Sequence, residues 1–500
     1  MNHSTSKPYL IAVDQGTTSS KAIVMDREGT ILSVSEGFPV TGLYPEAGWV
    51  EYDPEQMFQS VCKAARSAVE RAGISFQEVA ALGLDNQGET TITFDSTSGH
   101  PVGNAISWQD RRTEDLIEQW RQQGLEEPIR MQTGLRLDPY FSASKLKWVL
   151  NEYPEAGTLL KSGKLRMGTS DGWLIRQLTG GQRFVTDAAT ASRTMMLDLE
   201  KLTWSEDLLG RFELPAECLP EIVRCDECIG ETDPKLFGIP IPITGLCVDQ
   251  HAALFGQGCF NTHQAKATYG TGCFLLNNIG NDSTARAEGL LTLLAWQLKD
   301  SKAFAVEGGV YSAGSIIEWL VKLGWLEQVS DLDAVAGSVD HSDGTCLIPA
   351  FSGLAAPHWK SRARACWSGM HNGTEPKHLV RAAVESIAFR VREIYDAMSQ
   401  AGLRLDGMKV DGGLTRSQVL MQIQSDILGV PLTVSENPEA TATGVALMAG
   451  LGVGWWSHLN DLPEVSKTAA VYQPNSTDSD NLLTHYNHWS GICKKVAAWN

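Results

Sequence analysis

Residues 9–21, YLIAVDQGTTSSK, decide the fold of this chain, because a short apolar strand leads directly into an acid, a glycine and a row of hydroxyls. Gly16 permits a tight turn with converging backbone N–H groups, and the hydroxyls after it can donate to phosphate oxygens. Asp14 would repel a phosphate, so we interpret its carboxylate as a ligand, direct or through water, for the Mg²⁺ that accompanies a nucleotide. A plain β-hairpin, in which Asp and Gly serve turn geometry alone, explains this segment equally well. The rest of the chain decides between the two.

The composition is that of an ordinary globular protein. The 500 residues are 43% hydrophobic and 20% charged, which is enough for two or three domains. Lys plus Arg number 41 against 59 Asp plus Glu, and the net charge of −18 disfavours nucleic acid or an anionic membrane surface as the main partner. A nucleotide can still bind, because backbone amides, Mg²⁺ and a few local cations decide that. We therefore expect a small neutral substrate.

The sequence also indicates a location. The polar residues 1–8 are followed by only five apolar residues before Asp14, so we expect no secretory signal. The longest uncharged tract, residues 440–456, is rich in Gly and Ala and predicts a tightly packed helix rather than a membrane span. Ten scattered cysteines lack the spacing of a small disulfide-linked domain. We expect a cytoplasmic protein with no membrane insertion.

The first quarter of the chain alternates strand and helix signals. Residues 9–13, 22–25 and 31–34 read as antiparallel hairpin strands. A helix is predicted from Asp53, a capping residue that is followed by a proline. Residues 79–84 then form a buried strand, and a polar segment follows at its carboxyl end, where open α/β sheets place ligand groups.

The same signals return in the second half. Residues 265–274 place a Gly and Thr turn between apolar stretches, and residues 408–413 give a further glycine turn after a strand. Two phosphate-type turns about 250 residues apart predict two similar α/β lobes with a cleft between them. We place the boundary near residue 255, which divides the chain into domains 1–255 and 256–500.

A kinase that phosphorylates a neutral hydroxyl needs a phosphate cradle, a proton acceptor and polar groups that orient the substrate. Residues 243–250 form an apolar strand that ends at Asp249 and Gln250, just before a predicted helix. A carboxylate at such a strand end can accept the hydroxyl proton. An Asp at a helix start is also a common cap, and this alternative stays open for the residue taken alone.

Taken together, these residues resemble the FGGY family of carbohydrate kinases, and within it the members that phosphorylate glycerol. The resemblance covers nearly the whole chain and rests on ordered motifs at residues 14–19 (DQGTTS), 107–112 (SWQDRR), 138–142 (DPYFS), 186–195, 269–274 (YGTGCF), 140–148 and 365–385.

The resemblance implies a two-domain actin-like ATPase fold with ribonuclease H-like cores that closes around ATP and its substrate. It makes Asp249 the base and Asp14 the Mg²⁺ ligand. The implied nucleotide contacts are Thr17, Thr18, Ser19 and Lys21 from the first lobe and Thr271, Gly272, Gly314, Gly412 and Gly413 from the second. The implied substrate contacts are Gly88, Glu89, Trp108, Tyr140, Asp249, Gln250 and Phe274. Family members are often dimers or tetramers, so a homo-oligomer is expected.

One position departs from the pattern. Glycerol-phosphorylating members carry an arginine where this chain has Gly88, and that arginine donates to substrate hydroxyls. Its loss removes up to five donors and is expected to leave space for a larger group or for water. The expected activity is ATP-dependent phosphorylation of a terminal hydroxyl of a small polyol, glycerol first, with a tetritol or a small ketose as the alternative.

Two other classes of function stay open. A non-catalytic sugar sensor would keep the fold, although it predicts erosion at Asp14, Thr17 or Asp249, which are all intact. An actin-like filament or chaperone-type ATPase would not need the motifs at Trp108 and Tyr140. Family members that fructose 1,6-bisphosphate inhibits use a glycine-rich loop with an arginine, whereas the corresponding residues 230–238 contain acids and no arginine. The resemblance therefore implies no such inhibition.

Overall fold

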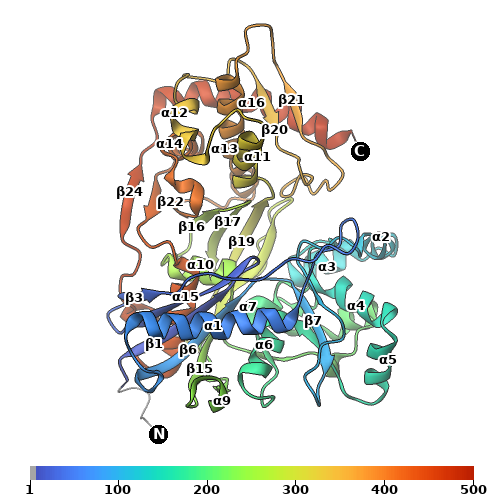
Figure 1. The fold of residues 1–500 in the computed structure, drawn as a ribbon. Coiled ribbons are helices and arrows are strands. Elements are labelled where there is room, and N and C mark those ends of the chain that lie inside the picture. The colour runs from blue at the N-terminus through green and yellow to red at the C-terminus, as the bar shows by residue number, and fades with distance from the viewer. Residues whose placement is uncertain (1–6, 500) are drawn as a thin grey trace.

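The computed structural model describes residues 7–499, apart from the side chains of residues 476–479. Two seven-stranded sheets form the centre of the molecule, the first in the lower half of Figure 1 and the second in the upper half. The first has the order β14-β15-β6-β1-β2-β3, with β4 beside β2. Its strands are β1 (Tyr9–Gln15), β2 (Ser19–Asp26), β3 (Ile31–Val34), β4 (Phe38–Pro39), β6 (Val79–Asn86), β14 (Gly230–Glu231) and β15 (Pro242–Val248).

The second sheet repeats this plan. Its order is β18-β19-β17-β16-β22-β23-β24, built from β16 (Gln264–Tyr269), β17 (Cys273–Gly280), β18 (Leu291–Gln297), β19 (Lys302–Val310), β22 (Gly407–Asp411), β23 (Leu432–Ser435) and β24 (Thr468–Tyr472). In each sheet a central strand pairs antiparallel with the next strand and parallel with a later one: β1 with β2 and β6, and β16 with β17 and β22. The predicted hairpin strands and the two-lobed α/β fold are confirmed.

Smaller sheets flank the first lobe and extend the second. A four-stranded sheet has the order β5-β8-β7-β9, and three further pairs are β10–β13, β11–β12 and β20–β21. Their bounds are β5 (Glu51–Tyr52), β7 (Thr91–Asp95), β8 (Ala105–Ile106), β9 (Leu165–Thr169), β10 (Val185–Asp187), β11 (Leu197–Asp198), β12 (Thr203–Trp204), β13 (Glu221–Val223), β20 (Cys346–Ile348) and β21 (Cys366–Ser368).

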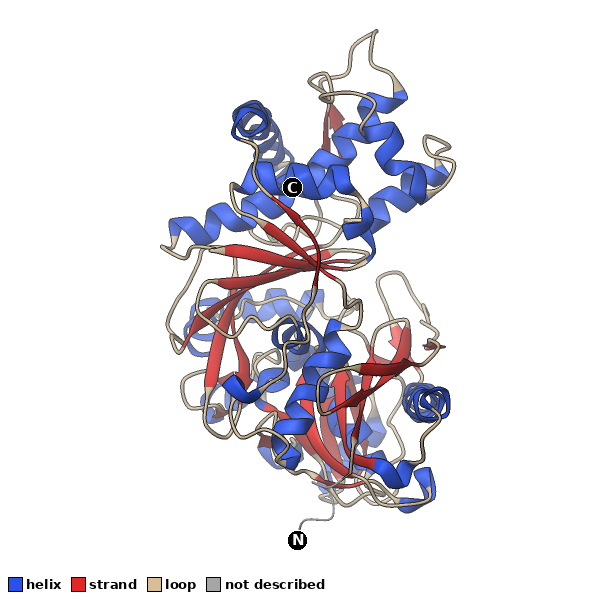
Figure 2. Cartoon of the chain, turned by 90° about the vertical axis from the view of Figure 1, so that its left-hand side faces the viewer, coloured by secondary structure: helices blue, strands red, loops and turns tan. Residues whose placement is uncertain are grey.

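Helices cover the sheets (Figure 2), and two of them share a core with strands of both large sheets. Those of the first half are α1 (Pro54–Ala72), α2 (Glu114–Gln122), α3 (Glu126–Thr133), α4 (Ser142–Glu152), α5 (Pro154–Lys161), α6 (Ser170–Leu178), α7 (Ala188–Ala191), α8 (Glu206–Phe212), α9 (Pro234–Phe237) and α10 (Asp249–Gly256). Those of the second half are α11 (Gly314–Lys322), α12 (Leu332–Ala336), α13 (Pro376–Gln400), α14 (Gln418–Leu428), α15 (Ala440–Val453) and α16 (Ser476–Ala498). The helix predicted from Asp53 is α1, whose first turn the Asp53 carboxylate caps by accepting from the N–H of Glu55 at 2.9 Å.

Helix α15 joins the two halves of the molecule. It packs against β1, β6 and β15 of the first sheet and crosses α10. Gly444 makes the crossing possible, because a Cβ there would lie 1.8 Å from the Ala252 carbonyl oxygen. The predicted helix within residues 440–456 is therefore confirmed as a packed element. The boundary near residue 255 stays a prediction, since this helix from the second half of the chain packs against the first sheet.

One expected loop is a helix. The Ser- and Asp-rich residues 475–481 read as a surface loop, but α16 begins at Ser476. None of the helices within residues 7–499 is both long and apolar enough to cross a membrane.

Candidate functional site

A cavity of about 730 Å³ opens between the two sheets, and half of the residues predicted to meet phosphate or substrate line it. The turn after β1 contributes threonines from one side, and the turn after β16 contributes threonine and glycine from the other. The predicted residues that line it are Thr17, Thr18, Trp108, Tyr140, Gln250, Thr271, Gly272 and Phe274.

The turn between β1 and β2 is a tight hairpin turn. The N–H of Gly16 donates to the Ser19 carbonyl at 3.1 Å, so the segment is both a hairpin and one wall of the cavity. The Thr17 hydroxyl accepts a hydrogen bond from the Trp108 indole N–H at 3.0 Å, which fixes the aromatic ring beside the turn. Ser19 and Lys21 do not line the cavity, and the Lys21 ammonium instead pairs with Glu439 at 3.2 Å.

The turn between β16 and β17 is built on close backbone approaches. A Cβ on Gly314 would lie 2.6 Å from the Gly270 carbonyl oxygen, and one on Gly412 would lie 2.4 Å from the Tyr269 carbonyl oxygen. Gly412 also has a φ of +95°, a conformation that favours glycine. Both residues therefore shape the turn from behind, whereas the next residue, Gly413, has open space where a side chain would be.

Carboxylates gather at the carboxyl ends of the first sheet. Asp14 on β1 and Asp85 on β6 are neighbours across the parallel pair, close enough for the Asp14 charge to act on the Asp85 carboxyl group. Burial raises the pKa of Asp14 to about 6, and burial together with the Asp14 charge raises that of Asp85 well above its usual range. Asp85 is fully buried, and among residues 7–499 its carboxyl oxygens have no hydrogen-bond partner.

This donor set fits a hard divalent cation. Two carboxyl groups in contact repel when both are ionised, unless a proton or a cation lies between them. Carboxylate oxygens are the ligands that Mg²⁺ takes from proteins. Asp14 was predicted for this role. Asp85 was missed, because only the strand register shows that it lies beside Asp14.

Asp249 is the first residue of α10, next to the cavity-lining Gln250. Its carboxylate accepts from the Gln250 N–H at 2.6 Å, and the positive end of the helix dipole favours its ionised form. Burial nevertheless raises the pKa of Asp249, an effect that the nearby Arg193 charge partly offsets. The Gln250 amide oxygen accepts from the buried Lys266 ammonium at 2.7 Å, which turns the amide N–H₂ away from that contact.

Glu89 and Gly88 lie behind the aromatic wall. Glu89 is 1% exposed, adopts a left-handed backbone conformation with a φ of +55°, and accepts from the Arg193 guanidinium at 2.5 Å. Burial raises the pKa of Glu89 to about 7. The expectation of open space at Gly88 is wrong for its side-chain direction: a Cβ there would lie 3.1 Å from Val248 Cγ2 and 3.2 Å from Arg193 Nε. The side chains of Val248 and Arg193 fill the volume beside Gly88 that was expected to be open.

Several cavity residues were not predicted as site residues. Arg111 pairs with Glu114 at 2.8 Å and with Asp138 at 3.3 Å, and its guanidinium lines the same wall as Trp108. Gln109, Glu114, Thr268 and Gly270 also line the cavity, and later loops contribute Tyr311, Phe351, Ser352, Ser361 and Arg364. Arg111 lies within one of the motifs quoted above, so its position was available as a signal, whereas the loop residues carried none.

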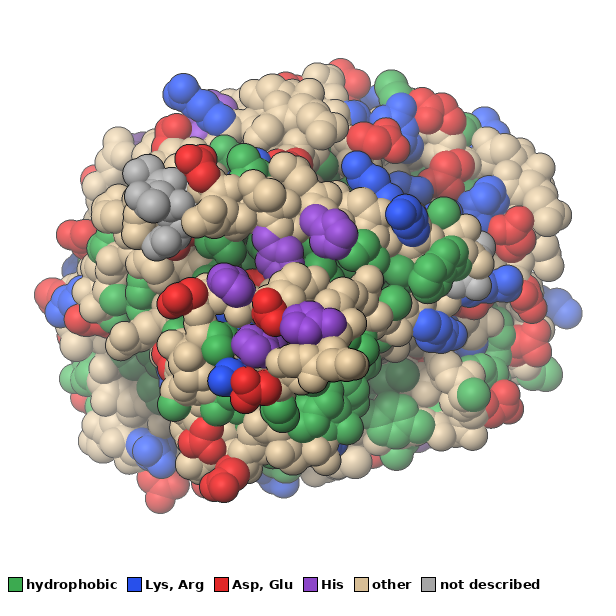
Figure 3. Space-filling view, turned by 90° about the horizontal axis from the view of Figure 1, so that it is seen from above, with side chains coloured by type: hydrophobic (Ala, Val, Ile, Leu, Met, Phe, Trp, Pro, Cys, Tyr) green, Lys and Arg blue, Asp and Glu red, His purple; other side chains and the backbone are tan. Residues whose placement is uncertain are grey.

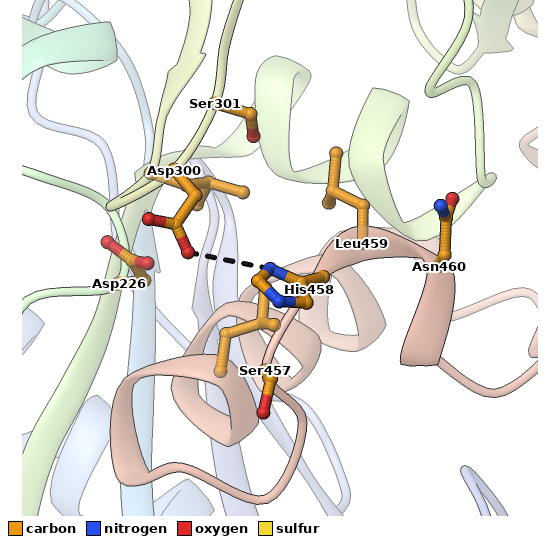
Figure 4. A pocket seen from close by; sticks show the side chains of 9 residues that line it. Asp226, Asp300, Ser301, Ser457, His458, Leu459 and Asn460 are labelled. Carbon is orange, nitrogen blue, oxygen red and sulfur yellow. Dashed lines mark ion pairs between the residues drawn. The ribbon is translucent and has the colours of Figure 1, made fainter.

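A second, smaller pocket lies apart from these residues (Figure 4). Asp226, Asp300 and His458 line it, with His458 Nδ1 3.5 Å from an Asp300 carboxylate oxygen. The pair is more than half exposed to solvent, and none of the predicted site residues takes part. We assign no ligand to this pocket.

Histidine side chains also gather on the outer face of the second lobe (Figure 3). His341, His371 and His378 each accept a backbone N–H at Nδ1. That bond leaves the proton of a neutral ring on Nε2, and His371 Nε2 lies 2.7 Å from Asp343. These rings therefore hold local turns and are not arranged as ligands around one ion.

The comparisons with known proteins agree with this geometry. Residues 9–256 match the N-terminal domain of the FGGY family of carbohydrate kinases, and residues 265–453 match its C-terminal domain. The chain belongs to the FGGY family. It is 42% identical over 493 residues to the glycerol kinase of Paraburkholderia phytofirmans, covering 98% of both chains, and also 42% identical to that of Burkholderia multivorans with the same coverage.

Solved structures of FGGY kinases superpose closely on this one. A glycerol kinase of Plasmodium falciparum with ADP has a TM-score of 0.89 at 31% identity, covering 97% of this chain and 98% of that one. A xylulose kinase of Lactobacillus acidophilus has the same TM-score at 21% identity, covering 98% and 99%, which shows the shared fold.

Proposed function

We propose that this FGGY kinase transfers the γ-phosphate of ATP to a terminal hydroxyl of a small polyol, with glycerol as the first candidate. The observation that carries the proposal is the position of Asp249 at the start of α10, beside Gln250 in the wall of a cavity that both phosphate-type turns line. Full-length similarity to the glycerol kinases named above supports glycerol. The filled space at Gly88 argues against a longer acceptor.

Each part of the cavity has a task in this reaction. Trp108, Tyr140 and Phe274 offer apolar faces to the carbon chain of the polyol, while Glu89 and Gln250 orient its hydroxyls. Asp249 accepts the proton of the attacking hydroxyl, and its raised pKa makes it a better base than an exposed carboxylate.

The two threonine and glycine turns hold the other substrate. Thr17 and Thr18 approach the phosphates of ATP from one sheet, and Thr271 and Gly272 approach them from the other. Asp14 and Asp85 would hold Mg²⁺, which supplies neutralisation of charge on the phosphate oxygens. Because the two turns belong to different sheets, closure of the cleft brings both onto the nucleotide and excludes water from the phosphoryl group.

The test is ADP release from Mg-ATP with glycerol, tetritols, pentitols, dihydroxyacetone and small ketoses as acceptors. We expect glycerol to have the highest kcat/KM and Asp249→Asn to lower kcat by about 10²- to 10⁴-fold, as loss of a general base does. Asp300→Asn in the second pocket is the matched control and should leave kcat unchanged. A higher kcat/KM for a longer polyol or a ketose would refute glycerol. If no acceptor is turned over and Asp249→Asn has no effect on ATP hydrolysis, the alternative of a non-catalytic sugar sensor would be favoured.

Location and assembly follow the same proposal. We infer a cytoplasmic enzyme, supported by ten cysteines that form no disulfide in the described structure. We infer a homo-oligomer from the family resemblance, and light scattering of the purified protein tests it.

A further inference from the structure

The side chain of Arg193 lies behind the acceptor wall, just after α7, and is 1% exposed. Its Nε donates to Glu89 at 2.5 Å, and one terminal nitrogen donates to the Tyr140 hydroxyl at 3.1 Å. Both partners are residues that we assign to the polyol. The guanidinium therefore fixes the position of two substrate contacts at once.

The same guanidinium reaches the second sheet. Its two terminal nitrogens donate to the Glu307 carboxylate at 2.8 and 3.0 Å, a bidentate pair with a residue of β19. Glu307 is 1% exposed. Arg193 lies in the part of the chain that matches the N-terminal family domain and Glu307 in the part that matches the C-terminal one, so this ion pair crosses the cleft.

The five N–H groups of Arg193 are all used within the protein. One goes to Glu89, two to Glu307, one to Tyr140, and the last lies 3.3 Å from His251 Nε2. No donor remains for a ligand. Arg193 therefore acts on a bound polyol only through the residues that it holds.

Gly88 explains how the guanidinium reaches this position. A Cβ at residue 88 would lie 3.2 Å from Arg193 Nε and 3.4 Å from its Cδ, closer than side chains normally pack. The bare backbone of Gly88 thus provides the surface on which Arg193 rests. A side chain at this position would compete with Arg193 for the same volume.

We propose that Arg193 is the positioning residue of the acceptor site: it orients Glu89 and Tyr140 toward the polyol and couples them through Glu307 to the second sheet, and Gly88 makes room for it. This inference rests on the proposed function, because the two residues matter only if a polyol binds between them.

The charges around Glu89 give opposite expectations for two substitutions. The groups that face it are Arg193 and Lys145, which lower its pKa, and Glu307, which raises it, while burial brings it to about 7. Removal of the Arg193 charge should therefore raise the pKa of Glu89, and removal of the Glu307 charge should lower it. Since the ionised carboxylate is the form that accepts from a hydroxyl, the acidic limb of the pH profile of kcat/KM follows this pKa.

The experiment compares Arg193→Gln, Arg193→Lys and Glu307→Gln in the full-length enzyme. We expect Arg193→Gln to raise the KM for glycerol about 10- to 100-fold, the cost of a lost charged hydrogen bond, with the KM for ATP within twofold of wild type. The acidic limb of the pH profile of kcat/KM should move up by about one pH unit in Arg193→Gln, and it should move down in Glu307→Gln. The KM of Arg193→Lys for glycerol should lie between those of wild type and Arg193→Gln, because lysine keeps the positive charge but lacks the forked set of N–H donors of a guanidinium.

Controls separate this role from a structural one. Arg390 is equally buried and ion-paired, with Glu393, outside the cavity, so Arg390→Gln should leave the KM for glycerol and the pH profile unchanged. An unchanged KM and pH profile in folded Arg193→Gln overturns the proposal. If that variant does not fold, Glu307→Gln decides: the proposal is overturned if the acidic limb of its pH profile stays in place or moves up.

Failure of the proposed function is distinguishable. If wild-type enzyme turns over no polyol, titration calorimetry with glycerol alone measures binding in the same variants. If Arg193→Gln binds glycerol at least tenfold more weakly than wild type, the positioning role is supported without turnover. If wild type binds no glycerol, or if both bind it equally well, the role is refuted.

Discussion

The first and second sheets share one plan, yet the ends of their central strands carry opposite chemistry. On β1, Asp14 pairs across the strands with Lys21 and Asp85, and on β16, Thr268 pairs with Phe274 and Asp411 in the same positions. In the first sheet the carboxyl oxygens of Asp85 have no hydrogen-bond partner among the described residues.

In the second sheet, the acid at the matching position, Asp411, has a hydrogen-bond donor. Asp411 accepts from the Gln257 amide at 2.7 Å, and the buried Lys266 ammonium donates to the Thr268 hydroxyl at 2.9 Å. One end of the cleft is therefore rich in uncompensated acceptors, which suit a cation, and the other is rich in donors, which suit phosphate and substrate oxygens. The two similar sheets therefore place a cation side and an anion side on either side of the cleft.

Both sides depend on the crossing of α10 and α15, and breaking it should have the largest effect. We expect Gly444→Ala to lower the free energy of unfolding by about 3 kcal/mol, because the new Cβ lies 1.8 Å from the Ala252 carbonyl oxygen and the helices must move apart. Chemical denaturation measures this.

Gly491→Ala in α16 is the matched control, since nothing lies within 4 Å of its Cβ position. It should leave stability unchanged or raise it by up to about 1 kcal/mol through helix propensity. Equal stability of both variants would contradict the tight crossing.

The cation side is tested by Asp14→Asn. We expect Mn²⁺, used as a paramagnetic substitute for Mg²⁺, to bind about 10- to 100-fold more weakly in the absence of nucleotide, because an amide replaces a charged oxygen ligand. Electron paramagnetic resonance of free Mn²⁺ gives the affinity without turnover. Asp411→Asn, the matching change in the second sheet, should leave Mn²⁺ binding unchanged, and equal effects of the two substitutions would remove the distinction between the sheets.

The anion side is tested by Lys266→Met. Loss of its ammonium leaves the Gln250 amide oxygen without its donor, so the amide can rotate away from the substrate. We expect the KM for glycerol to rise about tenfold, as for one charged hydrogen bond. Steady-state kinetics measure this, with Lys302→Met on the exposed end of β19 as the control. A KM that stays at the wild-type value would show that Gln250 needs no anchor.

Local patterns predicted the fold and the cavity turns. The strand before Asp14, the helix after Asp53 and the Gly and Thr turn after residue 268 are each one continuous stretch of sequence, so local patterns were enough to predict them. Eight of the predicted residues line the cavity because turns at strand ends face the cleft whenever two such sheets meet.

What the sequence could not show depends on long-range register. Asp85 lies beside Asp14 only through the β1–β6 pairing, and Glu307 is 114 residues from Arg193. Gly88 illustrates the same limit: the sequence shows a missing side chain, but not that the Arg193 guanidinium, from the turn just after α7, fills its place.

The return of α15 to the first sheet also has a consequence for synthesis on the ribosome. Leu10 and Ile23 on one face of that sheet share a core with Val445 and Leu447 of α15. At ordinary elongation rates of about 5–20 residues per second, α15 emerges roughly 10–40 s after β15, and this apolar face stays uncovered for that interval. We therefore expect chaperones to bind the growing chain during this interval. Proteolysis of ribosome-stalled chains ending before and after α15 tests when the apolar face becomes protected.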